Sequence, residues 1–178
     1  DRAIKRAAGE GAGEMYELTY EGYGAGGVAL MVTCLTDNRN RTAPDIKFIF
    51  EKRGGNMGSP GSVSFLFAFR STFVVETGGR TEDELLEATL EAGAEDAELD
   101  GDLATVYAAP TEFLAVKAAL EAAGFTFLSA ETGYVAETRV AVASKEDARK
   151  VLALIEALED NDDVQDVYAN FDIPEEIL

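Results

Sequence analysis

The sequence predicts an α+β protein of two α/β domains with ferredoxin-like β-α-β elements, the second domain inserted into the first. Three observations support this class. Residues 14–70 follow the order β-β-α-β, residues 72–136 follow the order β-α-β-β-α-β, and a lone β-α-β tail ends the chain. Because such a tail cannot bury both faces of its own sheet, we expect it to pair with residues 14–70. The predicted domains are therefore 14–70 with 137–178, and 71–136 between them.

The first domain opens with a predicted hairpin. Residues 16–20 alternate apolar and polar side chains, as in a half-buried strand, and an apolar strand follows at 28–35. The glycines at 22–27 match the spacing of a dinucleotide-binding loop, but that loop must lead into a helix and here a strand follows. We interpret these glycines as a hairpin connection.

A helix is predicted from Thr42 to Arg53. Thr42 and Asp45 resemble a capping box, and Pro44 would fall in the first turn, where its missing N–H costs little. Gly54 and the glycine after it would end the helix. The next predicted strand is 62–69.

The second domain carries local signals for each of its elements. A strand at 72–76 precedes a capping box at Thr81 and Glu84, which opens the first helix. Asp100 and Gly101 predict a hairpin between strands 97–99 and 103–109. Thr111 is the expected cap of the second helix, and a strand follows within 125–135. The tail is predicted as a strand at 138–143, a helix at 144–159 and a strand at 164–171.

Composition argues against several functional classes. The chain has no histidine, which removes the commonest general base and the histidine ligands of metals. Nearly all carboxylates lie on predicted surface helices and loops, with nothing nearby to shift their pKa values. An enzyme is therefore the weaker interpretation, and we expect neither a cofactor nor a metal. The single cysteine, Cys34, lies in an apolar strand, which predicts a buried thiol and excludes a disulfide framework.

The sequence also indicates where the protein acts. No apolar run approaches the length of a membrane span, and no signal peptide begins the chain. We therefore expect a cytoplasmic protein without a membrane partner. Residues 1–8 resemble the last two turns of a basic helix ended by Gly9, without a helix start, so we expect a further segment upstream.

Charge is distributed unevenly along the chain. The net charge is −19, and residues 82–102 hold ten carboxylates and neither lysine nor arginine. Residues 156–178 hold nine carboxylates and again no basic residue. The stretch 37–58, by contrast, contains five basic residues. A nucleic acid would be repelled by the two acidic stretches and tolerated on the rest.

The basic stretch supplies the candidate site. Arg39 and Arg41 lie two apart before a helix N-terminus, where guanidinium groups and free backbone N–H groups suit phosphate. The loop 54–61 has few side chains and could approach a backbone or base closely. The candidate nucleic-acid-binding residues are Asn38, Arg39, Asn40, Arg41, Lys47, Lys52, Arg53, Gly54, Gly55, Asn56, Met57 and Gly58. The alternative is structural: the arginines pair with carboxylates of the neighbouring domain, and Gly54 caps the helix in a flexible connection.

Four segments together resemble one family. TYEGYG with GGVALMV, LTDNRNRT, FEKRGGNMG with GSVSFLF, and LALIEALEDNDDVQDVYANFDI resemble the YebC family. The resemblance implies three domains: a basic helical N-terminal domain, a middle α/β domain, and a third α/β domain inserted into the middle one. Residues 1–13 then resemble the remnant of the helical domain and its linker. Bacterial members are described as transcriptional regulators and are also tied to ribosome function, and mitochondrial relatives activate translation for cytochrome oxidase synthesis.

These observations predict a non-enzymatic regulator of gene expression that binds nucleic acid, with RNA in or around the ribosome favoured. A DNA-binding transcriptional regulator is the alternative, although no helix-turn-helix is evident in the sequence. A small-molecule-sensing module is a further alternative, because ferredoxin-like units often bind ligands between their elements. A monomer is the favoured oligomeric state.

Overall fold

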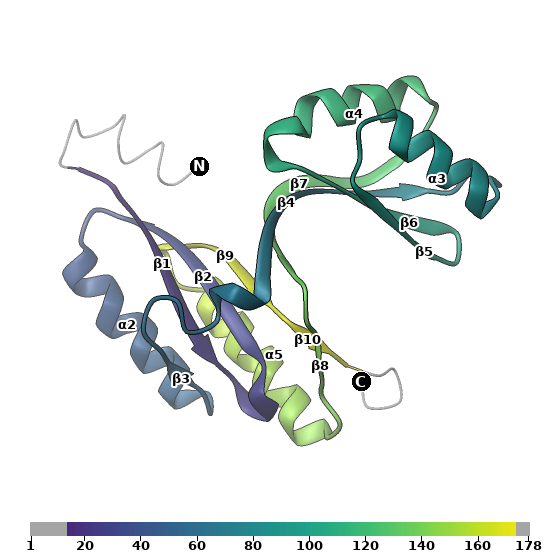
Figure 1. Cartoon of the computed structure of the whole chain (residues 1–178). Coiled ribbons are helices and arrows are strands. Elements are labelled where there is room, and N and C mark those ends of the chain that lie inside the picture. The colour runs from purple at the N-terminus through teal and green to yellow at the C-terminus, as the bar shows by residue number, and fades with distance from the viewer. Residues whose placement is uncertain (1–13, 174–178) are drawn as a thin grey trace. The chain divides into compact units, whose positions relative to one another are not determined.

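The computed structural model describes residues 14–173, and the basic helix predicted at 1–8 lies outside them. The chain forms two compact units, one made of the segments before Phe69 and after Val135, the other of Phe69–Val135 (Figure 1). One boundary falls inside a single strand, β4 (Phe67–Glu76), and the other at the end of β7 (Phe127–Ala136). Helices and antiparallel sheets occur in both units, which confirms the predicted α+β class.

The first unit is built on a four-stranded sheet in the order β3-β1-β2-β9. Its strands are β1 (Tyr16–Tyr23), β2 (Ala29–Thr36), β3 (Asn56–Met57) and β9 (Val164–Ala169). The glycines between β1 and β2 form a short 3-10 turn within an antiparallel hairpin, as predicted. β9 pairs antiparallel with β2, so the tail does complete this sheet. The Asn170 side chain fastens the end of β9, because its Oδ1 accepts a hydrogen bond from Ala29 N at 2.7 Å.

Two helices bury one face of this sheet, α2 (Arg39–Lys52) and α5 (Lys145–Glu159) (Figure 1). Alternate residues of β2 supply the sheet side of the core, and the apolar stripes of the helices supply the other side. The fully buried members are Leu30, Val32, Ile46, Phe50, Val151, Leu154 and Leu158. The helix predicted at 144–159 is α5, and Ser144 caps it by accepting a hydrogen bond from Asp147 N at 3.0 Å. Two short strands, β8 (Val140–Ala141) and β10 (Phe171–Asp172), pair in parallel beside this core.

The second unit has the ferredoxin-like strand arrangement. Its sheet order is β5-β6-β4-β7, so the first strand of the unit lies between the last and the third. The remaining elements are α3 (Glu82–Glu91), β5 (Asp96–Asp100), β6 (Leu103–Ala108) and α4 (Phe113–Ala122). The predicted capping box is present: Glu84 N donates to Thr81 Oγ1 at 3.2 Å, and Thr81 N donates to Glu84 Oε1 at 2.9 Å. The predicted hairpin at Asp100 and Gly101 is also present.

The start of α2 differs from the prediction. The N-cap is Asn38, whose side chain accepts a hydrogen bond from Arg41 N at 3.2 Å, so the helix begins at Arg39 and not at Thr42. Pro44 consequently lies inside the helix and not in its first turn. Thr42 is fully buried, and its hydroxyl lies 2.9 Å from Asp163 Oδ2. The hydroxyl of Thr42, the predicted cap, is therefore bound by Asp163, more than a hundred residues away in the sequence.

Several strand boundaries also differ. The strands expected at 62–69 and 72–76 are instead a 3-10 turn (Ser64–Leu66) followed by the single long strand β4. Part of the loop expected after α2 forms β3, which pairs with β1. Thr111 lies in a 3-10 turn, Pro110–Glu112, and does not cap α4. The strand expected at 138–143 shortens to β8, and the one expected at 164–171 is interrupted at Asn170, whose side chain bonds to neighbouring backbone.

Candidate nucleic-acid interface

The candidate residues 38–58 do not form one cluster, because α2 separates them. The helix has fourteen residues and a rise of about 1.5 Å per residue, so its ends lie roughly 20 Å apart. Asn38, Arg39, Asn40 and Arg41 lie at its N-terminal end, and all four are exposed. Lys52 and the residues up to Gly58 lie at its C-terminal end, with Lys47 exposed between the two groups.

At the N-terminal end, Arg41 is engaged by its own chain. Its Nη2 donates to both carboxylate oxygens of Asp163 at 3.0 Å, and it lies 3.5 Å from Asp37 Oδ1. These hydrogen bonds and the charge of Asp163 raise the pKa of Arg41 above its ordinary value. Arg41 thus pairs with a carboxylate, as the structural alternative held, but the partner belongs to the same unit and not to the neighbouring one.

Asp163 is a buried carboxylate that the sequence did not single out. Burial alone would raise its pKa, but the hydrogen bonds from Arg41 and Thr42 outweigh burial and hold the pKa below the ordinary value. Asp163 is therefore an exception to the expectation that nearly all carboxylates lie on the surface. Burial, together with the negative charge of Asp163, raises the pKa of Cys34 to about 12. The thiol therefore stays protonated and unreactive.

Arg39 lies against the start of β1. Its guanidinium carbon lies 4.6 Å from the centre of the Tyr16 ring, a cation–π distance. Both the stacked arginine and the neighbouring Asn40 remain exposed. A phosphate contact by these residues stays a prediction.

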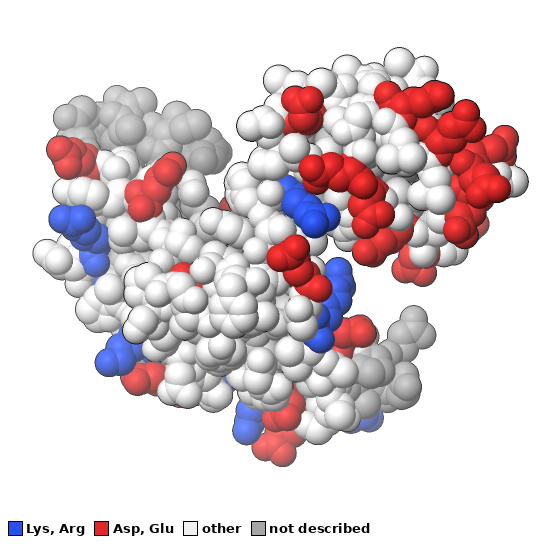
Figure 2. All heavy atoms as spheres, viewed as in Figure 1, with Lys and Arg blue, Asp and Glu red and all other residues white. Residues whose placement is uncertain are grey.

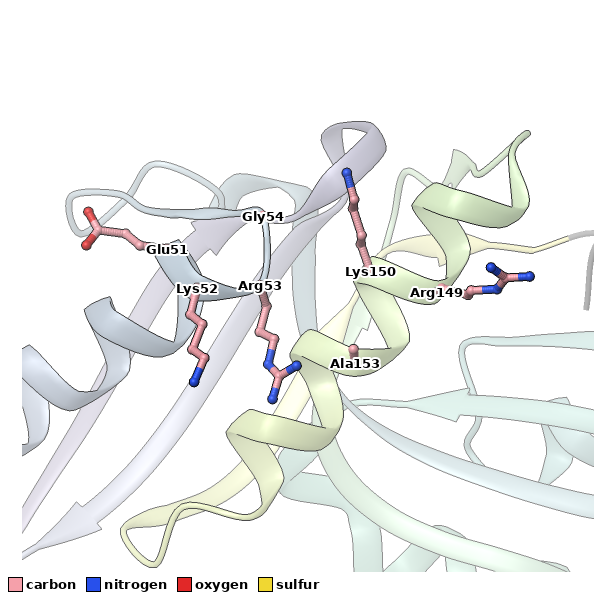
Figure 3. Close-up of a pocket in the computed structure, with 7 residues that line it drawn as sticks. All are labelled: Glu51, Lys52, Arg53, Gly54, Arg149, Lys150 and Ala153. Carbon is pink, nitrogen blue, oxygen red and sulfur yellow. The ribbon is translucent and has the colours of Figure 1, made fainter.

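At the C-terminal end, a hollow of about 490 Å³ opens between α2 and α5 (Figure 3). We call it the basic groove, and it is lined by Glu51, Lys52, Arg53, Gly54, Arg149, Lys150 and Ala153. Lys52 and Arg53 extend side by side from α2, Lys150 extends from α5 past Gly54, and the Arg149 side chain points away from α2. Lys150 Nζ lies 3.2 Å from Glu146 Oε1, but both side chains are well exposed, so this pair is weak.

The groove joins predicted residues to residues that the sequence analysis missed. Lys52, Arg53 and Gly54 were candidates, whereas Arg149 and Lys150 come from a helix almost a hundred residues later. The only signal for Arg149 and Lys150 was their position on the polar face of the predicted helix 144–159. That pattern does not identify the element that packs beside the helix. Basic side chains near the C-terminus of α2 also stabilise the helix dipole.

The glycines after α2 have structural reasons. Gly54 has φ of +83°, and Gly55 N donates to Phe50 O at 2.8 Å, which together form a Schellman-type helix end. Gly54 therefore ends the helix, as the structural alternative held. Gly55 is buried against the backbone of β1. Of the remaining candidates, Asn56 and Gly58 are exposed, and Met57 packs against the core.

A second buried carboxylate, Glu21 of β1, anchors the loop that follows β3. Its Oε2 accepts from Gly61 N at 2.7 Å, and its Oε1 accepts from Val63 N at 2.9 Å and Ser64 N at 2.7 Å. Burial would raise the pKa of Glu21, but these backbone hydrogen bonds outweigh it and lower the pKa. The carboxylate thus holds the loop 58–64 against β1.

Replacing Glu21 with glutamine is expected to destabilise the first unit by about 2 kcal/mol, because an amide cannot accept all three hydrogen bonds. The loop should open before the rest of the unit. The one remaining oxygen of glutamine can still accept from both Val63 N and Ser64 N, whereas its NH2 group faces Gly61 N. Hydrogen exchange of the Gly61 amide, which loses its acceptor, should therefore accelerate more than exchange of β2 amides. Glu17→Gln, an exposed change in the same strand, is the control. Equal exchange in both variants would contradict an anchoring role.

Comparison with known proteins identifies the family. The family model described as "TACO1/YebC second and third domain" matches residues 15–171. The chain belongs to the TACO1/YebC family. Among TACO1/YebC relatives, one from Rubrobacter xylanophilus is 52% identical over 99% of this chain and 71% of its own length. One from Halothermothrix orenii is 49% identical over all of this chain and 72% of its own length. Both are named "Probable transcriptional regulatory protein".

A crystal structure of similar fold supports the same assignment. It is of a conserved hypothetical protein from Aquifex aeolicus, 44% identical, with a TM-score of 0.80 over 99% of this chain and 73% of that protein. The TACO1/YebC family carries regulatory names, which fits a protein that is not an enzyme. In residues 14–173, no helix is long and apolar enough to cross a bilayer. Within the same residues, no three metal-ligating side chains of the His, Cys, Asp or Glu type gather to hold an ion.

Proposed function

We propose that this chain is a non-enzymatic regulator of gene expression that binds nucleic acid through the basic groove, with RNA in or around the ribosome as its target. The observation that carries the proposal is the groove itself. Two elements distant in sequence place Lys52, Arg53 and Lys150 around one hollow in a chain whose net charge is −19. Cations gathered against such a background favour a polyanion that is held locally and repelled elsewhere.

The acidic second unit limits how a polyanion could bind. Residues 82–102 lie on α3, β5 and the turns around them, and Figure 2 shows acidic side chains crowding part of this unit. This surface would repel a phosphate backbone unless high salt screened the charges. Contacts are therefore expected from the first unit alone.

The order of helices and strands favours RNA binding over direct recognition of promoter DNA. Each of the helices α2, α3, α4 and α5 is followed by a strand, so the described residues contain no helix-turn-helix. The DNA-binding alternative rests on the names of the relatives, "Probable transcriptional regulatory protein". Protection of a defined operator in a footprint would favour that alternative.

Reversing the groove charges tests the proposal. We expect the double change Lys52→Glu and Arg53→Glu to weaken binding of a labelled single-stranded RNA on the order of 100-fold at low salt. The slope of log affinity against log salt concentration should also become shallower, by an amount that corresponds to the loss of about two phosphate contacts. Fluorescence anisotropy across a salt series measures both quantities. Co-sedimentation with ribosomes at low and high salt then checks the proposed target.

The matched control changes Arg139 and Lys145 to glutamate. Both are exposed, both lie in the first unit, and neither lines the groove. Because each double variant replaces two basic residues with two glutamates, the change in net charge is the same in both. Binding should fall much less in this control. Equal loss in the two double variants would mean that net charge, and not the groove, governs binding.

A further inference from the structure

Phe48 is an exposed aromatic residue on α2 that the core does not need. The apolar stripe of the helix is buried through Ile46 and Phe50, both 0% exposed, whereas Phe48 is 62% exposed. Two residues along a helix correspond to a turn of about 200°, so Phe48 lies on the face opposite this stripe. Phe48 therefore contributes little to packing.

Phe48 has charged neighbours of both signs on α2, the carboxylates Asp45 and Glu51 three residues away and two lysines. Lys47 precedes it and is exposed, and Lys52 Nζ lies 5.7 Å from the centre of its ring. This cation–π contact is long, and it leaves most of the ring accessible. Lys52 also lines the basic groove, so the ring lies next to one of the cations of the groove, although Phe48 is not itself a lining residue.

An accessible aromatic ring beside cations matches one ligand chemistry. In single-stranded nucleic acid the bases are free to stack on aromatic side chains while the phosphates contact lysine and arginine. In a duplex the base faces are stacked on one another and cannot reach such a ring. The combination therefore selects for unpaired nucleotides.

We infer that Phe48 is the base-stacking residue of the basic groove, and that the groove accepts single-stranded nucleic acid in preference to duplex. This inference rests on the proposed function and specifies its ligand. Lys52 and Arg53 hold the phosphates, and Phe48 holds the face of an adjacent base. Lys47, one residue before the ring, extends the same basic surface.

The absence of tryptophan from the sequence permits a direct test. Phe48→Trp introduces a single tryptophan, whose fluorescence a stacked base would quench. We expect quenching by a short oligouridine RNA and little change with an RNA duplex of equal length. Phe65→Trp is the matched control, because Phe65 is 70% exposed in the first unit but lies in the turn Ser64–Leu66 and not on α2 beside Lys52. Similar quenching in both variants, or quenching by duplex alone, would overturn the inference.

Affinity provides a second readout that does not depend on fluorescence. Phe48→Ala should weaken binding of the same oligouridine roughly tenfold, because one stacking contact is lost. The slope of affinity against salt should stay unchanged, since no charge is removed. Circular dichroism should show an intact fold, as Phe48 is not buried.

The two proposals fail in different ways. If the Lys52→Glu and Arg53→Glu variant loses binding while Phe48→Ala binds like the parent, the stacking inference is wrong and the proposed function stands. If the parent chain binds no single-stranded or duplex nucleic acid, the proposed function is wrong and the inference falls with it.

Discussion

Replacing Asp163 with alanine is expected to lower the free energy of unfolding by about 3 kcal/mol. Asp163 is 3% exposed and receives hydrogen bonds from Arg41 at the start of α2, with the Thr42 hydroxyl 2.9 Å away. Its removal takes away the shortest hydrogen bonds of the Thr42 hydroxyl and the Arg41 guanidinium, which keep only longer ones to Asn38 O and to Thr36 and Asp37. It also detaches the N-terminal end of α2 from the turn before β9. Urea unfolding followed by circular dichroism measures the effect.

The control for this change is Asp160→Asn. Asp160 is exposed at the C-terminal end of α5, where a negative charge is unfavourable to the helix dipole. Its replacement should leave stability unchanged or slightly increased. If Asp163→Ala proved no more damaging than Asp160→Asn, the buried network would be irrelevant to stability.

The pKa of Asp163 predicts the pH dependence of the same effect. Because its pKa is lowered in the folded state, its stabilising contribution is complete above the ordinary aspartate pKa of about 3.9. That contribution disappears as pH falls through the lower, folded-state pKa. The parent should therefore lose more free energy of unfolding between about pH 6 and pH 3 than Asp163→Asn. Relief of repulsion among the other carboxylates is common to both proteins and cancels in the comparison.

Gly55→Ala is expected to destabilise the first unit by about 3 kcal/mol. An added Cβ at Gly55 would collide with the carbonyl oxygen of Tyr23 and approach the Phe50 ring to 3.3 Å. Backbone oxygen atoms in a paired strand cannot move aside, so β3 would have to leave β1. Thermal unfolding monitored by circular dichroism measures the loss.

The adjacent glycine is the control that separates crowding from backbone conformation. At Gly54 an added Cβ meets only the Lys150 side chain, at 3.5 Å, but φ is +83°. Gly54→Ala should therefore cost about 1 kcal/mol, the penalty of a left-handed conformation alone. A larger loss in Gly54→Ala than in Gly55→Ala would show that conformation, and not the close approach to β1, explains this pair of glycines.

Local chemistry made much of the fold predictable. Thr81 with Glu84, and Asp100 with Gly101, act within a few residues, and both signals specify the structure that forms. Pairing of the tail with residues 14–70 was predicted from a general requirement, the burial of both faces of a sheet, and the strand it pairs with is β2. These predictions needed no knowledge of which side chains meet across the molecule.

The start of α2 and the basic groove, by contrast, depend on contacts between residues far apart in the sequence. Thr42 was the predicted cap, but Asn38 caps α2, and the Thr42 hydroxyl instead contacts Asp163, which lies far along the chain. The basic groove needs Arg53 and Lys150 to line one hollow, and this follows from how α5 packs against α2. The polar pattern of α5 indicated an exposed face, but one sequence does not say which helix lies next to that face.

The insertion of the second unit has a consequence for synthesis of the chain. β2 acquires its partner β9 only when Asn170 and its neighbours have been made, 141 residues after Ala29. The second unit is contiguous and can fold earlier, on the growing chain. Its first and last strands, β4 and β7, are neighbours in one sheet, and Glu137 N donates to Leu66 O at 2.8 Å just beyond them. Early folding of this unit would thus bring the two segments of the first unit together, shorten the loop to be closed, and reduce the time for which the edge of β2 is exposed to other nascent chains.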